Sequence, residues 1–159
     1  MPRLIGAKNT DLFNGPISAP TGKPMFYAYR TSSNNNTTSE SPLSFDTIQY
    51  DTMGGFDTST NKYTIPVEGL YLIFGGFGAY KNGDARSIEI FLRKNTTDVL
   101  RSDCFIAGVQ GNNTHTGVNF ASIQRGIIGD TYNMRMNATA SINIYASVQN
   151  NFFGALLIG

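Results

Sequence analysis

Turn-forming residues interrupt this chain at short and regular intervals. Signals such as Pro66, Asn82-Gly83 and Gly129-Asp130 separate apolar segments that are too short for most helices. Strands that recur about every 8–12 residues, with turn signals between them, are typical of a β-sandwich or a barrel. We therefore expect an all-β chain without a substantial helix.

Ten segments have the pattern of short strands. Residues 86–94 alternate most clearly, because Ile88, Ile90 and Leu92 fall on one side and Glu89 falls on the other. Residues 69–80 form the longest apolar run and predict a central strand that is buried on both faces. The ten expected strands are 25–30, 43–50, 62–65, 69–80, 86–94, 99–105, 118–125, 132–136, 142–148 and 152–158.

The first 24 residues predict an extended N-terminal arm, followed by a head domain over residues 25–159. Pro16, Pro20 and Pro24, with several glycines, exclude a regular helix in the arm. Its large apolar residues stand apart from one another and are candidates for attachment to a capsid or stem protein. They are Leu4, Ile5, Leu12, Phe13 and Ile17.

The net charge and the cysteine content argue against several classes of function. The net charge is +1 and the cationic residues are scattered, which argues against nucleic-acid and membrane partners. The single cysteine, Cys104, excludes an intrachain disulfide, and residues 1–6 hold no apolar run of signal-peptide length. We therefore expect a protein made in a cytoplasm.

No motif indicates catalysis, a metal site or a cofactor. His115 is the only histidine and lies in a polar loop, eleven positions after Cys104, without a carboxylate motif beside it. Asp46, Asp51 and Asp57 could meet at one end of a sandwich, so calcium near a trimer axis stays open. We expect a protein that is not an enzyme.

The segment from Phe45 to Tyr71 carries a family signature. Phe45, Asp51, Phe56, Gly69 and Tyr71 stand at the spacings typical of one motif. In this motif the chain resembles the globular head of complement component one-q, a relative of the tumour-necrosis-factor jelly roll. The resemblance covers about residues 24 to 159 and implies a ten-stranded jelly-roll sandwich.

The match has both departures and further agreements. Tyr63 stands where the family usually has Phe, and Ile73 and Gly75 replace aromatic residues. Gly129-Asp130 is similar to the family's turn before a late strand, and the residues from Phe152 to Leu157 resemble its closing strand. These motif residues are expected to pack in the core of the domain and not to form a binding site.

The resemblance also implies a homotrimer whose inner sheets meet on a three-fold axis. Five apolar residues supply more area than one sandwich needs, and they are candidates for that interface. Two or three of them could instead be ordinary core. The candidates are Tyr71, Ile73, Tyr145, Phe152 and Phe153.

Two hypotheses of function follow from these expectations. The first is a virion structural protein of a tailed phage. It would be a trimeric capsid decoration protein or a short fibre head that attaches to the major capsid or tail protein through its arm. The second is a secreted or cell-surface trimeric module that binds glycan or protein ligands. The polar, amide-rich loops 31–41, 81–86 and 108–116 are candidates for the outward surface.

Overall fold

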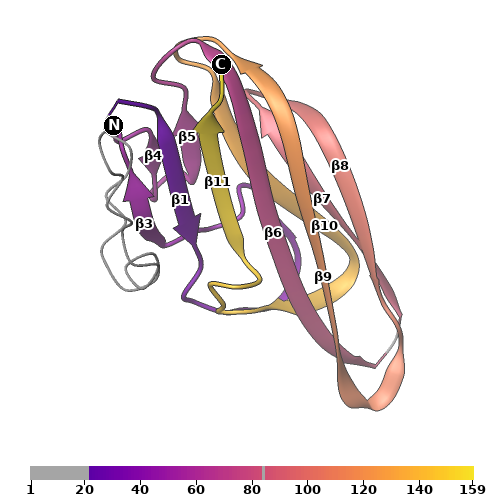
Figure 1. Ribbon diagram of the computed structural model, residues 1–159. Coiled ribbons are helices and arrows are strands. Elements are labelled where there is room, and N and C mark those ends of the chain that lie inside the picture. The colour runs from indigo at the N-terminus through magenta and orange to yellow at the C-terminus, as the bar shows by residue number, and fades with distance from the viewer. Residues whose placement is uncertain (1–21, 84) are drawn as a thin grey trace, which may run out of the picture.

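The computed structural model describes residues 22–83 and 85–159, and in this part every regular element is a strand (Figure 1). The same residues hold no helix with the length and apolar character needed to cross a membrane. The strands are β1 (Met25–Tyr29), β2 (Asn34–Glu40), β3 (Thr47–Asp51), β4 (Phe56–Asp57), β5 (Lys62–Thr64), β6 (Gly69–Gly83), β7 (Arg86–Lys94), β8 (Thr97–Ile106), β9 (Val109–Gly126), β10 (Thr131–Ile144) and β11 (Phe152–Leu157).

These strands form one continuous sheet that folds into two layers (Figure 1). The first layer has the order β3-β1-β11-β6-β9, and every pair in it is antiparallel. In the second layer β10 pairs with β2, β5 and β7, and β8 and β4 extend the layer beyond β7 and β5. The layers join where Asn143 and Ile144 of β10 pair with Tyr80 and Ala79 of β6.

The core lies between the layers and follows the alternation of the strands. Ile88, Ile90 and Leu92 of β7 are fully buried, as their spacing predicted. Across from them, Tyr71 and Ile73 of β6 are also fully buried. The all-β jelly-roll class that the sequence predicted is confirmed.

The strand count differs from the expected ten, because the described residues form eleven strands. The polar segment 31–41 was expected to be a loop, yet most of it forms β2 against β10. Residues 132–136 and the first three of 142–148 merge into the single strand β10, which ends at Ile144. Likewise, most of the loop expected at 108–116 is the beginning of β9.

Both ends of the described chain lie at the same end of the sandwich. The carbonyl of Pro24 accepts a hydrogen bond from the amide of Leu157 at 2.9 Å. The carbonyl of Gly159 accepts one from Leu70, at the beginning of β6. The β6–β9 pair runs from this end to the opposite one, where Tyr80 lies beside His115.

Candidate functional site

The outward face of the first layer carries large apolar side chains on neighbouring strands. Leu156 of β11 lies beside Leu72 of β6, and Leu72 lies beside Ile123 of β9. Leu72 and Leu156 are half-buried in the single chain, and Ile123 is 61% exposed. These residues form an aliphatic row across the sheet, at right angles to its strands.

A cluster of five aromatic rings continues this face beyond the aliphatic row. The ring centroid of Tyr27 lies 5.9 Å from that of Tyr50, 5.7 Å from Phe152, 6.3 Å from Phe74 and 6.4 Å from Tyr29. All five side chains are half-buried in the single chain. We call them, together with the aliphatic row, the aromatic face.

Two glycines allow these rings to lie flat on the sheet. A Cβ atom at Gly154 would lie 2.5 Å from Cζ of Phe74, which is closer than real side chains approach. A Cβ atom at Gly76 would overlap the ring of Phe152 in the same way. The two glycines therefore leave room for the rings of Phe74 and Phe152 against the backbone of the sheet.

Burial raises the pKa of two tyrosines in the aromatic face. Desolvation raises the pKa of Tyr27, and the neighbouring phenols of Tyr50 and Tyr29 raise it further. Desolvation also raises the pKa of Tyr50. Both phenols are therefore neutral at neutral pH, and no charge would have to leave water if this face were covered.

The outward face of the second layer has the opposite character, because ion pairs cover it. Asp98 pairs with Arg93 at 3.0 Å and also with Arg135. The guanidinium of Arg135 lies 3.8 Å from the ring centre of Phe91, so that ring is covered within the chain. Beside them Arg101 pairs with Glu89 at 2.7 Å. Covering this face would remove paired charges from water at a cost in free energy.

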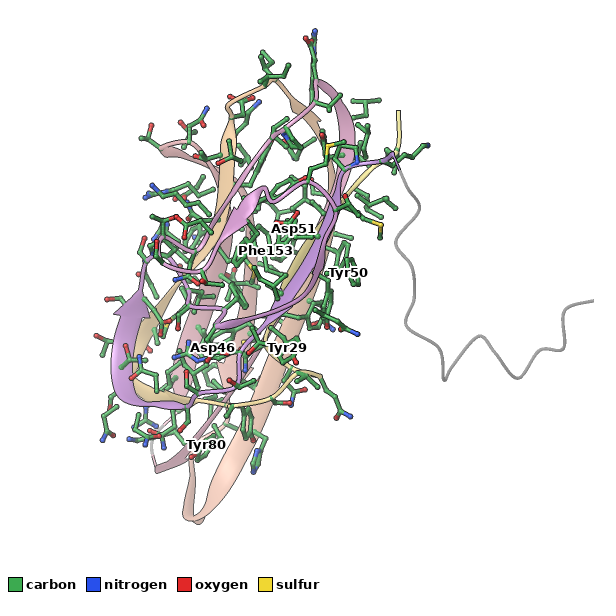
Figure 2. The ribbon with its side chains drawn as sticks, turned by 90° about the vertical axis from the view of Figure 1, so that its left-hand side faces the viewer. Tyr29, Asp46, Tyr50, Asp51, Tyr80 and Phe153 are labelled. Carbon is green, nitrogen blue, oxygen red and sulfur yellow. The ribbon has the colours of Figure 1, made fainter. Side chains whose placement is uncertain are left out.

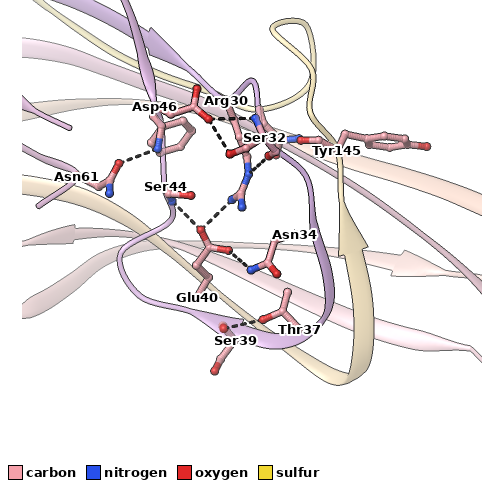
Figure 3. A network of polar contacts seen from close by, with 12 residues as sticks. Arg30, Ser32, Asn34, Thr37, Ser39, Glu40, Ser44, Asp46, Asn61 and Tyr145 are labelled. Atoms are coloured by element: carbon pink, nitrogen blue, oxygen red, sulfur yellow. Dashed lines mark hydrogen bonds and ion pairs between the residues drawn. The ribbon is translucent and has the colours of Figure 1, made fainter. Parts of the chain in front are cut away.

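A buried ion pair fixes the end of β1 next to the aromatic face (Figure 3). Arg30 is 4% exposed, and its Nη1 donates to Oε1 of Glu40 at 2.8 Å. Glu40 also accepts hydrogen bonds from the side chain of Asn34 and the amide of Ser44. Burial acts to raise the pKa of Glu40, but these hydrogen bonds and the charge of Arg30 lower it on balance.

A second carboxylate, that of Asp46, lies just before β3 and binds the residues that follow β1 (Figure 3). Asp46 accepts hydrogen bonds from the amide and the hydroxyl of both Thr31 and Ser32, at 2.7–3.0 Å. Burial acts to raise the pKa of Asp46, but hydrogen bonds from the hydroxyls of Ser32, Thr31 and Thr47 and from the amide of Thr31 lower it well below the usual range. The two carboxylates hold β1 and β3 in place, and with them Tyr29 and Tyr50.

The structure separates the five predicted interface residues into two groups. Tyr71, Ile73 and Phe153 are 0% exposed in the single chain, and Figure 2 shows Phe153 between the layers. A fully buried side chain offers no atom to another subunit, so these three pack the chain's own core instead. Phe152 and Tyr145 are half-buried and reach the surface, so their role at an interface stays a prediction.

Tyr145 lies beside Gly78, two residues along β6 from the Gly76 that Phe152 covers, and belongs to a stack of three rings. Its ring centroid is 4.8 Å from that of Tyr80 and 5.3 Å from that of His115. Figure 3 shows Tyr145 pointing away from the network around Glu40. The stack therefore adjoins the aromatic face on the same side of the first layer.

The groups considered for chemistry are held in structural roles. Burial raises the pKa of the Cys104 thiol, while the hydroxyl of Thr116 acts to lower it. Asp51 accepts a hydrogen bond from the amide of Phe56, and Asp57 accepts two from Ser59. Within residues 22–83 and 85–159, no group of three or more His, Cys, Asp or Glu side chains is placed to hold a metal ion.

Sequence reasoning missed most of the aromatic face. Tyr27, Leu72 and Phe74 alternate with buried residues, so both sides of their strands are apolar and the pattern does not tell inside from outside. The glycines opposite the rings are the signal that could have identified the outer side. The five predicted attachment residues of the arm, from Leu4 to Ile17, lie outside the described residues.

Comparison with known proteins agrees with this architecture. A family model described as C1q domain matches residues 25–127, which run from β1 past the end of β9. No curated protein matches the chain. The matched segment contains all five signature residues from Phe45 to Tyr71, and it covers well over half of the chain. The chain belongs to the C1q domain family.

Proposed function

We propose that three copies of this chain form a homotrimer through the aromatic face. C1q domains are jelly-roll modules that typically form trimers and are generally not enzymes. The observation that carries the proposal is the contrast between the two outer faces. One is rich in aromatic and aliphatic side chains, and the other is covered by ion pairs.

A second and third copy of the chain are the partners that best fit this face. Burying apolar surface contributes about 25 cal/mol per Å², so covering half-exposed aromatic and aliphatic residues stabilises the assembly. Covering the same face of each subunit by rotation around one axis also closes the assembly, so no apolar face is left to form a fibre. Phe152 is the residue predicted from sequence that takes part in this interface.

Ile123→Asp tests the trimer. Ile123 is 61% exposed on the aromatic face, so the change should leave the single subunit folded and should place a charge inside the interface. We expect light scattering to show a trimer for the unaltered chain and a monomer for the variant. The circular dichroism of a β-sheet should be unchanged.

A matched control comes from the second layer. Phe105 is 59% exposed on the outward side of β8, so Phe105→Asp introduces the same charge at nearly the same exposure. This variant should remain a trimer. A monomeric unaltered chain, or an Ile123→Asp variant that stays trimeric, would contradict the proposed interface.

We propose further that the trimer is a structural protein of a virion, either a capsid decoration protein or a short fibre head. Five spaced apolar residues in the first 24 positions support an attachment role toward a major capsid or tail protein. The described chain begins and ends at one end of the sandwich, so the opposite end is free to face outward. Assembly in the host cytoplasm belongs to the same proposal.

The alternative is a secreted or cell-surface recognition module for glycan or protein ligands. Membership of the C1q domain family is equally compatible with it, because the family match does not distinguish the two settings. The genomic neighbours of the reading frame separate them. Capsid or tail genes beside it would support the virion role, and a secretion signal in frame before Met1 would contradict it.

A further inference from the structure

A shallow hollow lies on the first layer at the end that is far from both chain ends. Its floor includes Gly117 of β9, which lies beside Gly78 of β6. Neither residue carries a side chain, and a Cβ at Gly117 would be 3.2 Å from the carbonyl oxygen of Phe77. The hollow has a volume of about 360 Å³, within the range of about 300–1,000 Å³ that small-molecule sites have.

Rings and an amide form the walls of this hollow. Tyr145 and His115 line it, and their rings stack at 5.3 Å with an angle of 11° between their planes. Asn150 lines the other side and lies against the backbone of Gly78. Thr116 completes the lining.

The wall is rigid because one buried amide holds the connection between β10 and β11. Asn151 is 2% exposed, and its side chain donates to the carbonyls of Gly78 and Tyr145 at 3.1 Å. Its side-chain oxygen accepts a hydrogen bond from the amide of Gly78 at the same distance. Tyr145 and Asn150 are therefore positioned before any ligand arrives, which reduces the entropy cost of binding.

The lining contains no carboxylate, ammonium or guanidinium group. Lys81, which follows the stacked Tyr80 on β6, is already occupied by a hydrogen bond to Asn36. A site without a cation does not select phosphate or another anion. Ring faces beside amide and hydroxyl groups instead match a molecule that has one apolar face and a rim of neutral hydroxyls.

A neutral pyranose sugar has this form, with axial C–H groups on one face and hydroxyls around its edge. We propose that the hollow formed by Gly117, Tyr145, His115 and Asn150 binds one neutral sugar residue of a glycan. The sugar lies with its C–H face on the rings, and Asn150 forms hydrogen bonds with its hydroxyls. Tyr145 then belongs to this binding site and not to the trimer interface.

The position of the hollow fits recognition at a distance from the attachment point. The hollow lies beside Gly78, toward the end of β6 that is opposite Leu70 and Gly159, and it adjoins the aromatic face at Phe152, whose ring lies over Gly76. The inference goes beyond the proposed trimer and does not depend on the virion role.

Saturation-transfer NMR on the full chain tests the site with glucose, galactose, mannose and N-acetylglucosamine as probes. We expect at least one of them to bind with a Kd on the order of 1 mM, as suits a shallow site for one sugar. Tyr145→Ala should weaken this binding by about tenfold or more, which corresponds to about 1.4 kcal/mol. Gly117→Thr, which fills the floor, should abolish it.

Controls separate this site from the trimer. Phe105→Ala, on the second layer, should bind sugar as the unaltered chain does, and light scattering on every variant reports the trimer independently. Failure of all four sugars to bind the unaltered chain would overturn the proposal. So would unchanged binding in Gly117→Thr, or a neutral nucleoside such as uridine binding more tightly than every sugar.

Discussion

At the scale of single residues, the pair of Arg30 and Glu40 shows how a polar segment becomes ordered. The two side chains are 5% and 14% exposed, so both have lost most of their water. Such a pair is tolerated only when further hydrogen bonds satisfy it, and here Asn34, Ser44 and the carbonyl of Ser32 supply them. The pair therefore organises the chain between β1 and β3.

Glu40→Gln should lower the free energy of unfolding by about 2–3 kcal/mol, because it leaves the Arg30 charge buried without its partner. Urea denaturation measures this loss. Asp103→Asn is the control, since Asp103 and Arg101 are each 56% exposed and an exposed pair contributes about 0–1 kcal/mol. Equal losses in the two variants would show that burial of the pair has no special effect.

The same variant should change the pH dependence of stability. The pKa of Glu40 is lower in the folded chain than its ordinary value of 4.5, so its stabilisation is complete above that pH and is lost as the pH falls below it. In Glu40→Gln this part of the acid dependence should disappear. Denaturation at about pH 7 and about pH 3 in both proteins measures the difference.

At the scale of elements, the connection between β10 and β11 depends on a few contacts within the chain. It crosses the outer side of β6 at Gly78, where a Cβ would lie 2.6 Å from Cβ of Asn150. The side chain of Asn151 pairs with both backbone groups of Gly78. One buried amide and one glycine thus fix a whole connection on the surface of a strand.

Asn151→Ala should release this connection while the sandwich stays folded. Three hydrogen bonds of a buried side chain are lost, so we expect a loss of about 2–3 kcal/mol. Hydrogen exchange should become faster at residues 145–151 and stay unchanged in β7. Asn150→Ala is the matched control, because Asn150 is exposed and should change neither measurement. Equal exchange rates in both variants would contradict the role of Asn151.

The elements also show what the sequence can and cannot predict. The spacing of Ile88, Ile90 and Leu92 was sufficient to place β7, since only one of its sides is uniformly apolar. The strand β2 was missed because its order comes from distant partners, Arg30 and β10, and not from its own composition. Phe153 was assigned to an interface because β11 is apolar on both sides, and only the packing against β1 and β6 shows which side is inside.

At the scale of the whole molecule, the family and the jelly-roll fold were predictable from the signature residues. The sequence did not predict which outer face of the sandwich is apolar and which carries ion pairs. A jelly roll fixes which strands are neighbours. Whether an outer face is apolar or charged depends on which rings lie over glycines and which charged side chains form ion pairs with a neighbouring strand. Such pairings between distant residues become visible only in three dimensions.

Deletion of residues 1–21 tests the proposed attachment segment. The cut falls before Lys23 and Pro24, whose carbonyls accept hydrogen bonds from Thr52 and Leu157. We expect a folded trimer by light scattering that no longer sediments with the capsids or tails that bind the full chain. If the shortened protein still sediments with them, the attachment lies elsewhere on the head.

The common location of Pro24, Leu157 and Gly159 has a practical consequence for engineering. Cargo fused after Gly159 would emerge at the pole where Pro24 lies, so a fluorescent protein there would leave the hollow beside Tyr145 uncovered. Passenger peptides meant for display belong instead in the connection between β6 and β7, at the opposite pole.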